Sequence, residues 1–300
     1  MHYTSYGLTI ASALALPELP QDTTTPADSA PDVTIDFGAI DPAGLPNGNQ
    51  LGPFLWVTDD ALWLQVPEVA RFQISLGKRI TIDPAPGIDE DSLRVFLLGS
   101  ALGALLFQRG YLVLHGNAIR IGGQCMICVG HSGAGKSTLA AGFLQRGYEI
   151  LADDVVPVDD TGAALPGFPR IKLWQDTATR LGIETAGLRR IRPQTEKFNY
   201  PLHERFTDRP LPIRWVYILN KHHEPDIRLD AIRGLQRFTP LRNNTYRVRF
   251  MEGMPLKSHH LQRCGLLAGR IHLARVTRPD HGFELDTLID RILADIAAHP

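Results

Sequence analysis

A run of nine residues, Gly130 to Thr138, constrains the fold of this 300-residue chain more than any other feature. It matches the pattern G-x-x-x-x-G-K-[ST], in which backbone N–H groups and a helix N-terminus bind phosphate groups. The apolar stretch 124–129 before it predicts a buried strand. Residues 138–146 follow with a helical pattern that Gly147 closes. Strand, loop and helix together predict a P-loop nucleotide site in an α/β fold.

The chemistry of such a loop gives its residues distinct roles. Lys136 can reach the β- and γ-phosphates of a nucleotide, and the hydroxyl of Ser137 can bind Mg²⁺. We therefore expect ATP and Mg²⁺ as the ligands. The candidate nucleotide-binding residues are Gly130, His131, Ser132, Gly133, Ala134, Gly135, Lys136, Ser137 and Thr138.

Two adjacent carboxylates, Asp153 and Asp154, follow the next predicted strand, residues 148–152. At a strand end beside a phosphate loop, one carboxylate can bind Mg²⁺ and the other can accept the proton of an attacking hydroxyl. His115, also expected at a strand end, could orient an aspartate or a phosphate, or be structural. The sequence alone leaves the roles of the two aspartates open.

Composition argues against several classes of partner. The hydrophobic fraction of 44% and the charged fraction of 21% are typical of a globular chain. A formal net charge of −1 gives no general attraction to nucleic acid or to an anionic membrane. The most apolar segment, residues 93–107, is too short for a membrane span and predicts a core helix. We expect neither a nucleic-acid nor a membrane partner.

Cys125 and Cys128 form a C-x-x-C pattern inside a predicted strand. Residues three apart in a strand face opposite sides, so we expect two buried thiols rather than a redox pair. The absence of a disulfide framework fits a reducing compartment. The first residues also lack the basic start of a signal peptide. These features predict a cytoplasmic protein.

The sequence pattern changes near residue 88. Residues 1–88 hold short alternating stretches between turns, which predict a small antiparallel, β-rich N-terminal module. Residues 89–300 begin with a long helix that we expect Asp91 and Ser92 to cap, and they contain the phosphate loop. We therefore expect a second domain over 89–300 that carries the catalytic site.

Several basic side chains follow the paired aspartates. The transition state of phosphoryl transfer accumulates negative charge, which Arg or Lys can stabilise. The carboxylate at the end of a peptide would also attract a cation. The candidate substrate-binding residues are Arg170, Lys172, Lys197 and, as a fourth, Arg242.

Residues 115–154 resemble the core of the HPr kinase/phosphorylase family. The resemblance is carried without gaps by His115-Gly116, by Gly130-x-x-Gly133-x-Gly135-Lys136-Ser137 and by Gln145-Arg146-Gly147-Tyr148-x-x-x-Ala152-Asp153-Asp154. It implies a fold similar to phosphoenolpyruvate carboxykinase, with Lys136 on the phosphates and Ser137 on Mg²⁺. It also implies Asp154 as the base toward a serine hydroxyl and His115 as the partner of that base. We assign Asp153, with Ser137, to the metal.

The chain departs from the HPr enzymes in two respects. Their Glu-Ile-Arg-Gly-Leu-Gly stretch has no counterpart soon after the aspartates, since Ile232-Arg233-Gly234-Leu235 comes later and lacks the Glu. The first 88 residues also do not look like the N-terminal domain of those enzymes.

Softer patterns over most of the chain resemble the HPr-kinase-like proteins of lasso peptide biosynthesis. These patterns are Tyr6-Gly7-Leu8-x-Ile10-x-Ser12-x-x-x-Leu16-Pro17-Glu18-Leu19, Phe168-Pro169-Arg170-Ile171-Lys172-Leu173-Trp174 and Leu241-Arg242-x-x-Thr245-Tyr246-Arg247. The resemblance implies a kinase that phosphorylates the C-terminal serine of a precursor peptide, its partner. A homo-oligomer is compatible with it. Two alternatives stay open: an HPr kinase/phosphorylase, and a non-catalytic nucleotide-binding module of a peptide maturation pathway.

Overall fold

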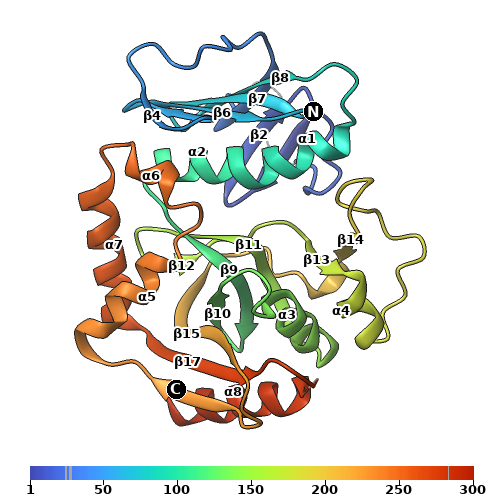
Figure 1. The fold of residues 1–300 in the computed structure, drawn as a ribbon, viewed down its shortest axis with the longest axis vertical. Coiled ribbons are helices and arrows are strands. Elements are labelled where there is room, and N and C mark those ends of the chain that lie inside the picture. Colours follow the sequence, from blue (N-terminus) through green and yellow to red (C-terminus); the bar gives the residue numbers. More distant parts are fainter. Residues whose placement is uncertain (24–25, 27–28, 283) are drawn as a thin grey trace.

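The computed structural model describes residues 1–23, 26, 29–282 and 284–300. It is a mixed α/β structure, as the sequence predicts. Two large sheets lie on either side of one long helix, residues 90–108 (Figure 1). No helix among the described residues has both the length and the apolar character that a membrane span requires.

The first sheet has eight strands in the order β1-β2-β3-β8-β7-β6-β5-β4. Strand β3 pairs in parallel with both β2 and β8, so the sheet is mixed and the predicted purely antiparallel arrangement is wrong. The chain crosses over after β2, so that β3 runs parallel to β2. Strands β4 to β8 then form an antiparallel meander, and its last strand, β8, pairs in parallel with β3. The strands are β1 His2–Ser5, β2 Leu8–Ser12, β3 Val33–Phe37, β4 Asn49–Gly52, β5 Leu55–Val57, β6 Ala61–Val66, β7 Ala70–Ser75 and β8 Arg79–Pro84.

The long helix covers one face of the first sheet. It consists of α1 Glu90–Phe96, a π-helical segment η1 Leu97–Ala101, and α2 Leu102–Gln108. Its N-cap is Asp89, whose carboxylate accepts a hydrogen bond from the Ser92 N–H at 2.8 Å, and not the predicted Asp91 and Ser92. The apolar core continues from this sheet through the helix to Val155 and Tyr246. The domain boundary at residue 88 stays a prediction.

The second sheet has seven strands in the order β10-β9-β11-β12-β15-β17-β16. Strand β10 also pairs with β15, so the strands from β10 to β15 form a closed ring of pairings. Only β10–β15 and β15–β17 are parallel pairs. The strands are β9 Leu112–Ile121, β10 Gln124–Gly130, β11 Glu149–Val158, β12 Ala163–Ala164, β15 Leu211–His222, β16 Arg228–Ala231 and β17 His272–Pro279.

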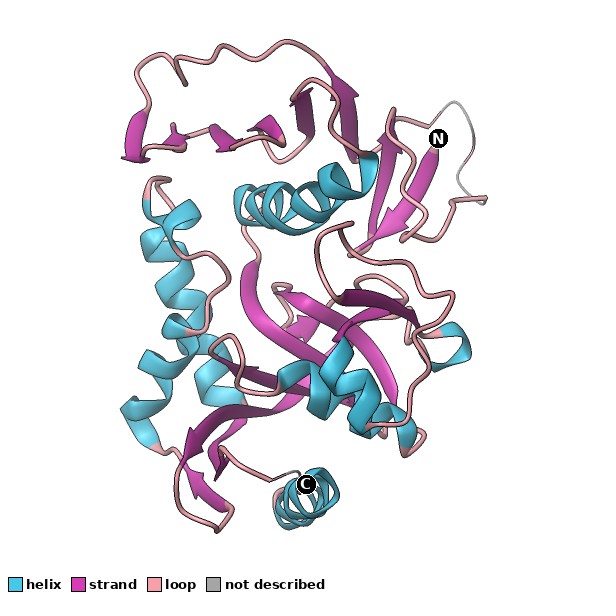
Figure 2. Ribbon diagram, turned by 45° about the vertical axis from the view of Figure 1, so that its right-hand side comes forward, coloured by secondary structure: helices cyan, strands magenta, loops and turns pink. Residues whose placement is uncertain are grey.

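Helices cover both faces of the second sheet (Figure 2). Cys128 lies in the core under α3 and α8, whereas Cys125 lies in the core under α5 and α7. The prediction that these two thiols face opposite sides is therefore confirmed, and the three cysteines are buried and free. The helices are α3 Lys136–Gln145, α4 Gln175–Arg180, α5 Phe238–Asn243, α6 Arg249–Glu252, α7 Lys257–Arg270 and α8 Leu285–Ala298, with 3₁₀ turns η2 His203–Arg205 and η3 Gly234–Arg237.

A separate two-stranded ribbon lies beside the second sheet. It pairs β13 Arg170–Trp174 with β14 Lys197–Pro201 in antiparallel register. Ile171 and Leu173 point into the core under α3, so the alternate residues of β13 point away from it. This ribbon supplies three of the candidate substrate-binding residues to the site described below.

Candidate functional site

The predicted strand and helix flank the glycine-rich loop. Strand β10 ends at Gly130 and helix α3 begins at Lys136, with Gly135 as its N-cap. Gly130 has φ +145°, and a side chain there would lie 2.6 Å from the carbonyl oxygen of Leu219. Gly135 has φ +106°, also in the left-handed region that favours glycine. The backbone therefore requires glycine at both positions.

Lys136 lies over the loop with its side chain buried. Its ammonium group donates to the carbonyl oxygens of Gly130 at 2.7 Å and His131 at 3.3 Å. Burial lowers the pKa of Lys136, although the charges of the nearby Asp154 and Asp153 oppose that shift. An ammonium group held only by neutral carbonyls is available to an incoming anion.

The other loop residues differ in exposure. His131, Ser132 and Gly133 are exposed, whereas Ala134 is buried. Ser137 is half-buried, and its hydroxyl has no hydrogen-bond partner among the residues that the structure describes. The hydroxyl of Thr138 instead lies 3.2 Å from that of Thr177 in helix α4.

A cavity of about 280 Å³ borders the loop at Gly135 and Thr138. Arg278, from the end of β17, lies on its wall and donates to the carbonyl oxygen of Ala134 at 3.0 and 3.2 Å. Sequence reasoning missed Arg278, because it lies far along the chain in no recognisable motif. The cavity therefore lies directly beside the glycine-rich loop.

The paired aspartates lie in the middle of strand β11, not at a strand end as the sequence predicts. The strand continues because the apolar residues 155–158 keep pairing with β9, down to Val158 opposite Leu112. Asp154 itself has φ +76°, a left-handed conformation that is uncommon for a residue other than glycine. Such local strain is often found at functional sites.

Asp153 is half-buried and held from two sides. One carboxylate oxygen accepts from the side-chain amide of Asn117 at 2.5 Å, and the other accepts from the Lys172 N–H at 2.7 Å. Burial and the adjacent charge of Asp154 raise the pKa of Asp153. Asn117 is a site residue that the sequence analysis missed, although it lies two positions after His115.

Asp154 lies beside the side chains of Lys172 and His115. Its carboxylate is 3.1 Å from the Lys172 ammonium group and 3.3 Å from Nδ1 of His115. Burial favours the neutral acid, but the charges of Lys172, His115 and Lys197 outweigh it and hold the pKa of Asp154 well below its usual range. This carboxylate is therefore ionised at neutral pH.

His115 lies within β9, paired with β11, rather than at the predicted strand end. Its Nδ1 also lies 3.0 Å from the main-chain oxygen of Asp154, and its ring lies 5.7 Å from that of Tyr246. Burial lowers the pKa of His115 despite the nearby charge of Asp154. The geometry suits a residue that holds Asp154 in its unusual backbone conformation.

The β13–β14 ribbon presents three candidate cations on one face. Lys172 contacts Asp154 directly, and the Lys197 ammonium group lies over the Trp174 ring at 5.4 Å. Burial lowers the pKa of Lys197, against the opposing charges of Asp153 and Asp154. Arg170 is buried and also interacts electrostatically with both aspartates. These three residues therefore surround the paired carboxylates.

Arg242 does not join them. It is an exposed residue of helix α5, and the charges that it influences are those of His260 and Cys264 in helix α7. Among the described residues, no hydrogen bond or ion pair joins Arg242 to either aspartate. The residues after it turn toward the site instead: the main-chain oxygen of Asn244 accepts from the His115 N–H, and Tyr246 lies against the His115 ring.

Two tyrosines also lie near the aspartates. The side chain of Tyr6, from the turn between β1 and β2, is buried, and its hydroxyl has no partner among the described residues. Burial and the nearby charge of Asp154 raise the pKa of Tyr246 to about 12. The pKa of Tyr6 is also raised by burial, with smaller effects from Tyr246 and both aspartates. Both phenols therefore stay protonated near the carboxylates.

Positive charge exceeds negative charge around the loop. Lys136, Lys172, Lys197 and Arg170 each interact electrostatically with one or both aspartates, and Arg170 also interacts with Glu18. Excess cations at a helix N-terminus create a favourable site for a polyanion.

Comparison with solved structures finds chains that are similar to this one. No family model matches the chain, and no curated protein matches it. The HPr(Ser) kinase/phosphatase from Coxiella burnetii is 14% identical, over 62% of this chain and 90% of that one, with a TM-score of 0.28. At so low a TM-score, the function of the site has to be inferred from the residues of this chain alone.

Proposed function

We propose that this protein is an ATP- and Mg²⁺-dependent kinase that phosphorylates a serine of a peptide. The supporting observation is that a glycine-rich strand–loop–helix, an excess of cations and an ionised carboxylate meet in one site. A nucleoside triphosphate supplies the polyanion that such a site favours. The ionised carboxylate can accept the proton of a hydroxyl group, so a substrate that carries a hydroxyl group suits it.

In the proposed reaction, the serine oxygen attacks the γ-phosphorus, and the bond from that phosphorus to the leaving ADP oxygen breaks. The serine proton passes to Asp154, which is ionised at neutral pH and so has a free lone pair to receive it. Lys136, Lys172 and Lys197 stabilise the negative charge on the phosphoryl oxygens. His115 positions Asp154 through its two contacts.

The residues present also fit a divalent cation. The Ser137 hydroxyl has no partner among the described residues, and each Asp153 oxygen accepts one hydrogen bond, which leaves a lone pair. Ser137 and Asp153 would hold Mg²⁺, which when bound neutralises phosphate charge.

The finer identity of the substrate follows from the sequence resemblance. The patterns shared with the HPr-kinase-like proteins of lasso peptide biosynthesis favour the C-terminal serine of a precursor peptide as the acceptor. The excess of cations at the site is compatible with an acceptor that carries a carboxylate.

The replacement Asp154→Asn tests the proposal, because it keeps the shape of the side chain and removes its basicity. We expect the variant to bind ATP with Mg²⁺ normally in calorimetry and to lose phosphoryl transfer from radiolabelled ATP to serine-ended peptides. The matched control is Asp59→Asn, an exposed residue that should leave transfer unchanged. Normal transfer by Asp154→Asn would show that this residue is not the base.

The same assay separates the two alternatives. Labelling of HPr but not of serine-ended peptides would identify an HPr kinase. Binding of ATP without a labelled product from HPr or any peptide, even in a single turnover, would identify a non-catalytic nucleotide-binding module.

A further inference from the structure

A second cavity, of about 460 Å³, lies between the N-terminal segment and the β13–β14 ribbon. Pro17 and Glu18 form one wall, and Arg170 and Asn199 of the ribbon form another. No residue of the glycine-rich loop lines it, so it is distinct from the cavity beside that loop. Its walls combine apolar proline and leucine side chains with a few polar ones.

Arg170 is an unpaired cation on this cavity. Its side chain is 8% exposed, and among the described residues none of its guanidinium nitrogens has a hydrogen-bond or ion-pair partner. The Phe168 ring lies 5.4 Å from the guanidinium carbon. The Nε–H group of Arg170 is buried without an acceptor, which costs free energy because this donor has lost water and gained no partner. The charges of Glu18 and the two aspartates act on Arg170, but among the described residues no carboxylate lies within ion-pair distance of it.

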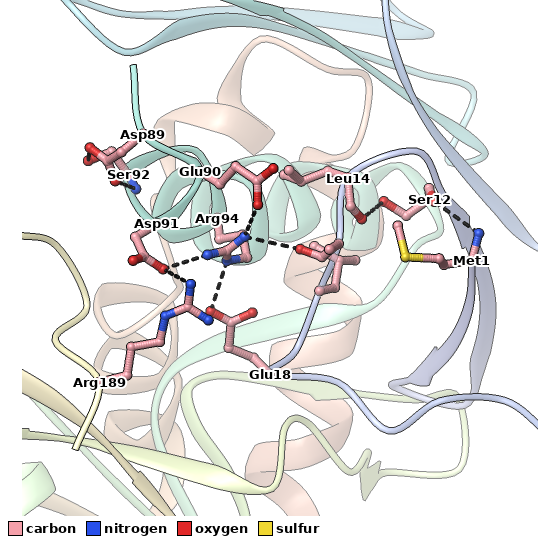
Figure 3. Close-up of polar contacts among 12 residues, drawn as sticks. Met1, Ser12, Leu14, Glu18, Asp89, Glu90, Asp91, Ser92, Arg94 and Arg189 are labelled. Atoms are coloured by element: carbon pink, nitrogen blue, oxygen red, sulfur yellow. Dashed lines mark hydrogen bonds and ion pairs between the residues drawn. The ribbon is translucent and has the colours of Figure 1, made fainter. Parts of the chain in front are cut away.

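The charge of Glu18 acts on Arg170, but among the described residues no hydrogen bond or ion pair joins the two side chains. Its side chain is 9% exposed, and one carboxylate oxygen lies 3.4 Å from Nε of Arg94. The other oxygen is buried without a partner among the described residues. Arg94 is itself held by Glu90 at 2.9 Å and Asp91 at 2.5 Å in helix α1 (Figure 3). Glu18 is thus fixed by Arg94 at the cavity wall.

The ribbon connects this cavity to the paired aspartates. Arg170 and Lys172 are two residues apart in β13 and share a face. Their partners across the ribbon, Pro201 and Asn199, lie on that same face. Lys172 contacts Asp154, whereas Arg170, Pro201 and Asn199 line the cavity. One polar surface therefore runs from the proposed base to the unpaired guanidinium.

We propose that this cavity binds a carboxylate of the acceptor peptide through Arg170, and that Pro17 and Glu18 make the N-terminal segment part of the acceptor site. The inference rests on the proposed function, since it takes the acceptor to be a peptide. A carboxylate matches a guanidinium in both charge and geometry. It can come from the C-terminus of the peptide or from an acidic side chain beside the serine.

Three synthetic probes distinguish these sources: acetyl-Ala-Ala-Ala-Ser as the free acid, the same peptide as its C-terminal amide, and acetyl-Ala-Ala-Asp-Ser amide. Their binding to the full chain is measured by NMR titration without nucleotide, so that the result does not depend on catalysis. We expect the free acid to bind about tenfold more tightly than the neutral amide, the range of a charge-assisted pair. Tight binding of the aspartate peptide would show that the cavity also binds a side-chain carboxylate.

Variants of Arg170 complete the test. Arg170→Met should remove the preference for the charged probes, Arg170→Lys should retain part of it, and the exposed control Arg79→Met should retain all of it. Equal binding of acid and amide to the unmodified protein would overturn the proposal, and that comparison stands even if Arg170→Met fails to fold. A preserved preference in folded Arg170→Met would overturn it as well.

Transfer assays with the same probes separate this inference from the proposed function. Preferential binding of the acid without any phosphorylated product would support the carboxylate site and contradict the kinase. Equal phosphorylation of acid and amide, unaffected by Arg170→Met, would support the kinase and contradict the site.

Discussion

The ammonium group of Lys172 lies 3.1 Å from the carboxylate of Asp154. The main-chain N–H of the same lysine donates to Asp153, so one residue of the ribbon contacts both aspartates of the sheet. This contact joins β13 to β11 and places a cation beside the proposed base. The charge state of the site therefore depends on how the ribbon docks.

Replacing Lys172 with Met should make phosphoryl transfer more sensitive to acid. The cation stabilises the ionised form of Asp154, so its removal raises the pKa of that carboxyl group. Transfer should then be lost at a higher pH as the solution is acidified, because the protonated acid cannot accept the serine proton. Initial rates measured across the acidic range check this. The exposed Lys78→Met should keep the original profile, and a matching profile in Lys172→Met would contradict the role of the pair.

Replacing Lys136 with Met should weaken ATP binding about tenfold or more, the loss expected when a charge-assisted contact to phosphate is removed. The fold should survive, because the ammonium group makes hydrogen bonds only to carbonyl oxygens of its own loop. Calorimetric titration with ATP and Mg²⁺ gives the affinity, and Lys257→Met on the exposed side of α7 is the control. Unchanged affinity would exclude Lys136 from phosphate binding.

Replacing Arg94 with Met should destabilise the fold by about 3 kcal/mol, near the low end for a buried ion pair that loses one partner. Without Arg94, Glu18 is left buried without its cation, whereas Glu90 is 64% exposed and water can solvate it. Urea unfolding of the variant against wild type measures the change, with the exposed Arg79→Met as the matched substitution. A difference within error of the control would show that the Arg94 cluster adds no stability.

Thiol reagents should not label the native protein. Burial raises the pKa of Cys128 and Cys264 to about 12 and that of Cys125 further still, so reactive thiolate is scarce. Labelling with a chromogenic disulfide should be slow in buffer and rapid in denaturant, where three thiols react. Fast labelling under native conditions would mean that at least one of these thiols is accessible.

The local parts of the site are predictable from sequence because short-range patterns specify them. The apolar run to Val129, the glycines of the loop and the helix after Lys136 each depend on neighbouring residues. Helix α8 is likewise local in origin, since its apolar residues recur with helical periodicity. The predictions fail where pairing with another strand sets the length of an element. The sequence predicts a strand end at Asp154, but β11 continues past it because β9 pairs with the residues that follow.

The sequence itself specified a glycine-rich loop before a helix, two adjacent carboxylates and a set of candidate cations. Only the tertiary structure decided which of those cations reach the carboxylates: Lys172 does, and Arg242 does not. It also brought Glu18 to the cavity that Arg170 lines, across more than 150 positions of chain. The physical reason is that the local periodicity of apolar residues indicates helices and short strands, whereas strand pairing and the packing of distant apolar surfaces set which polar faces meet.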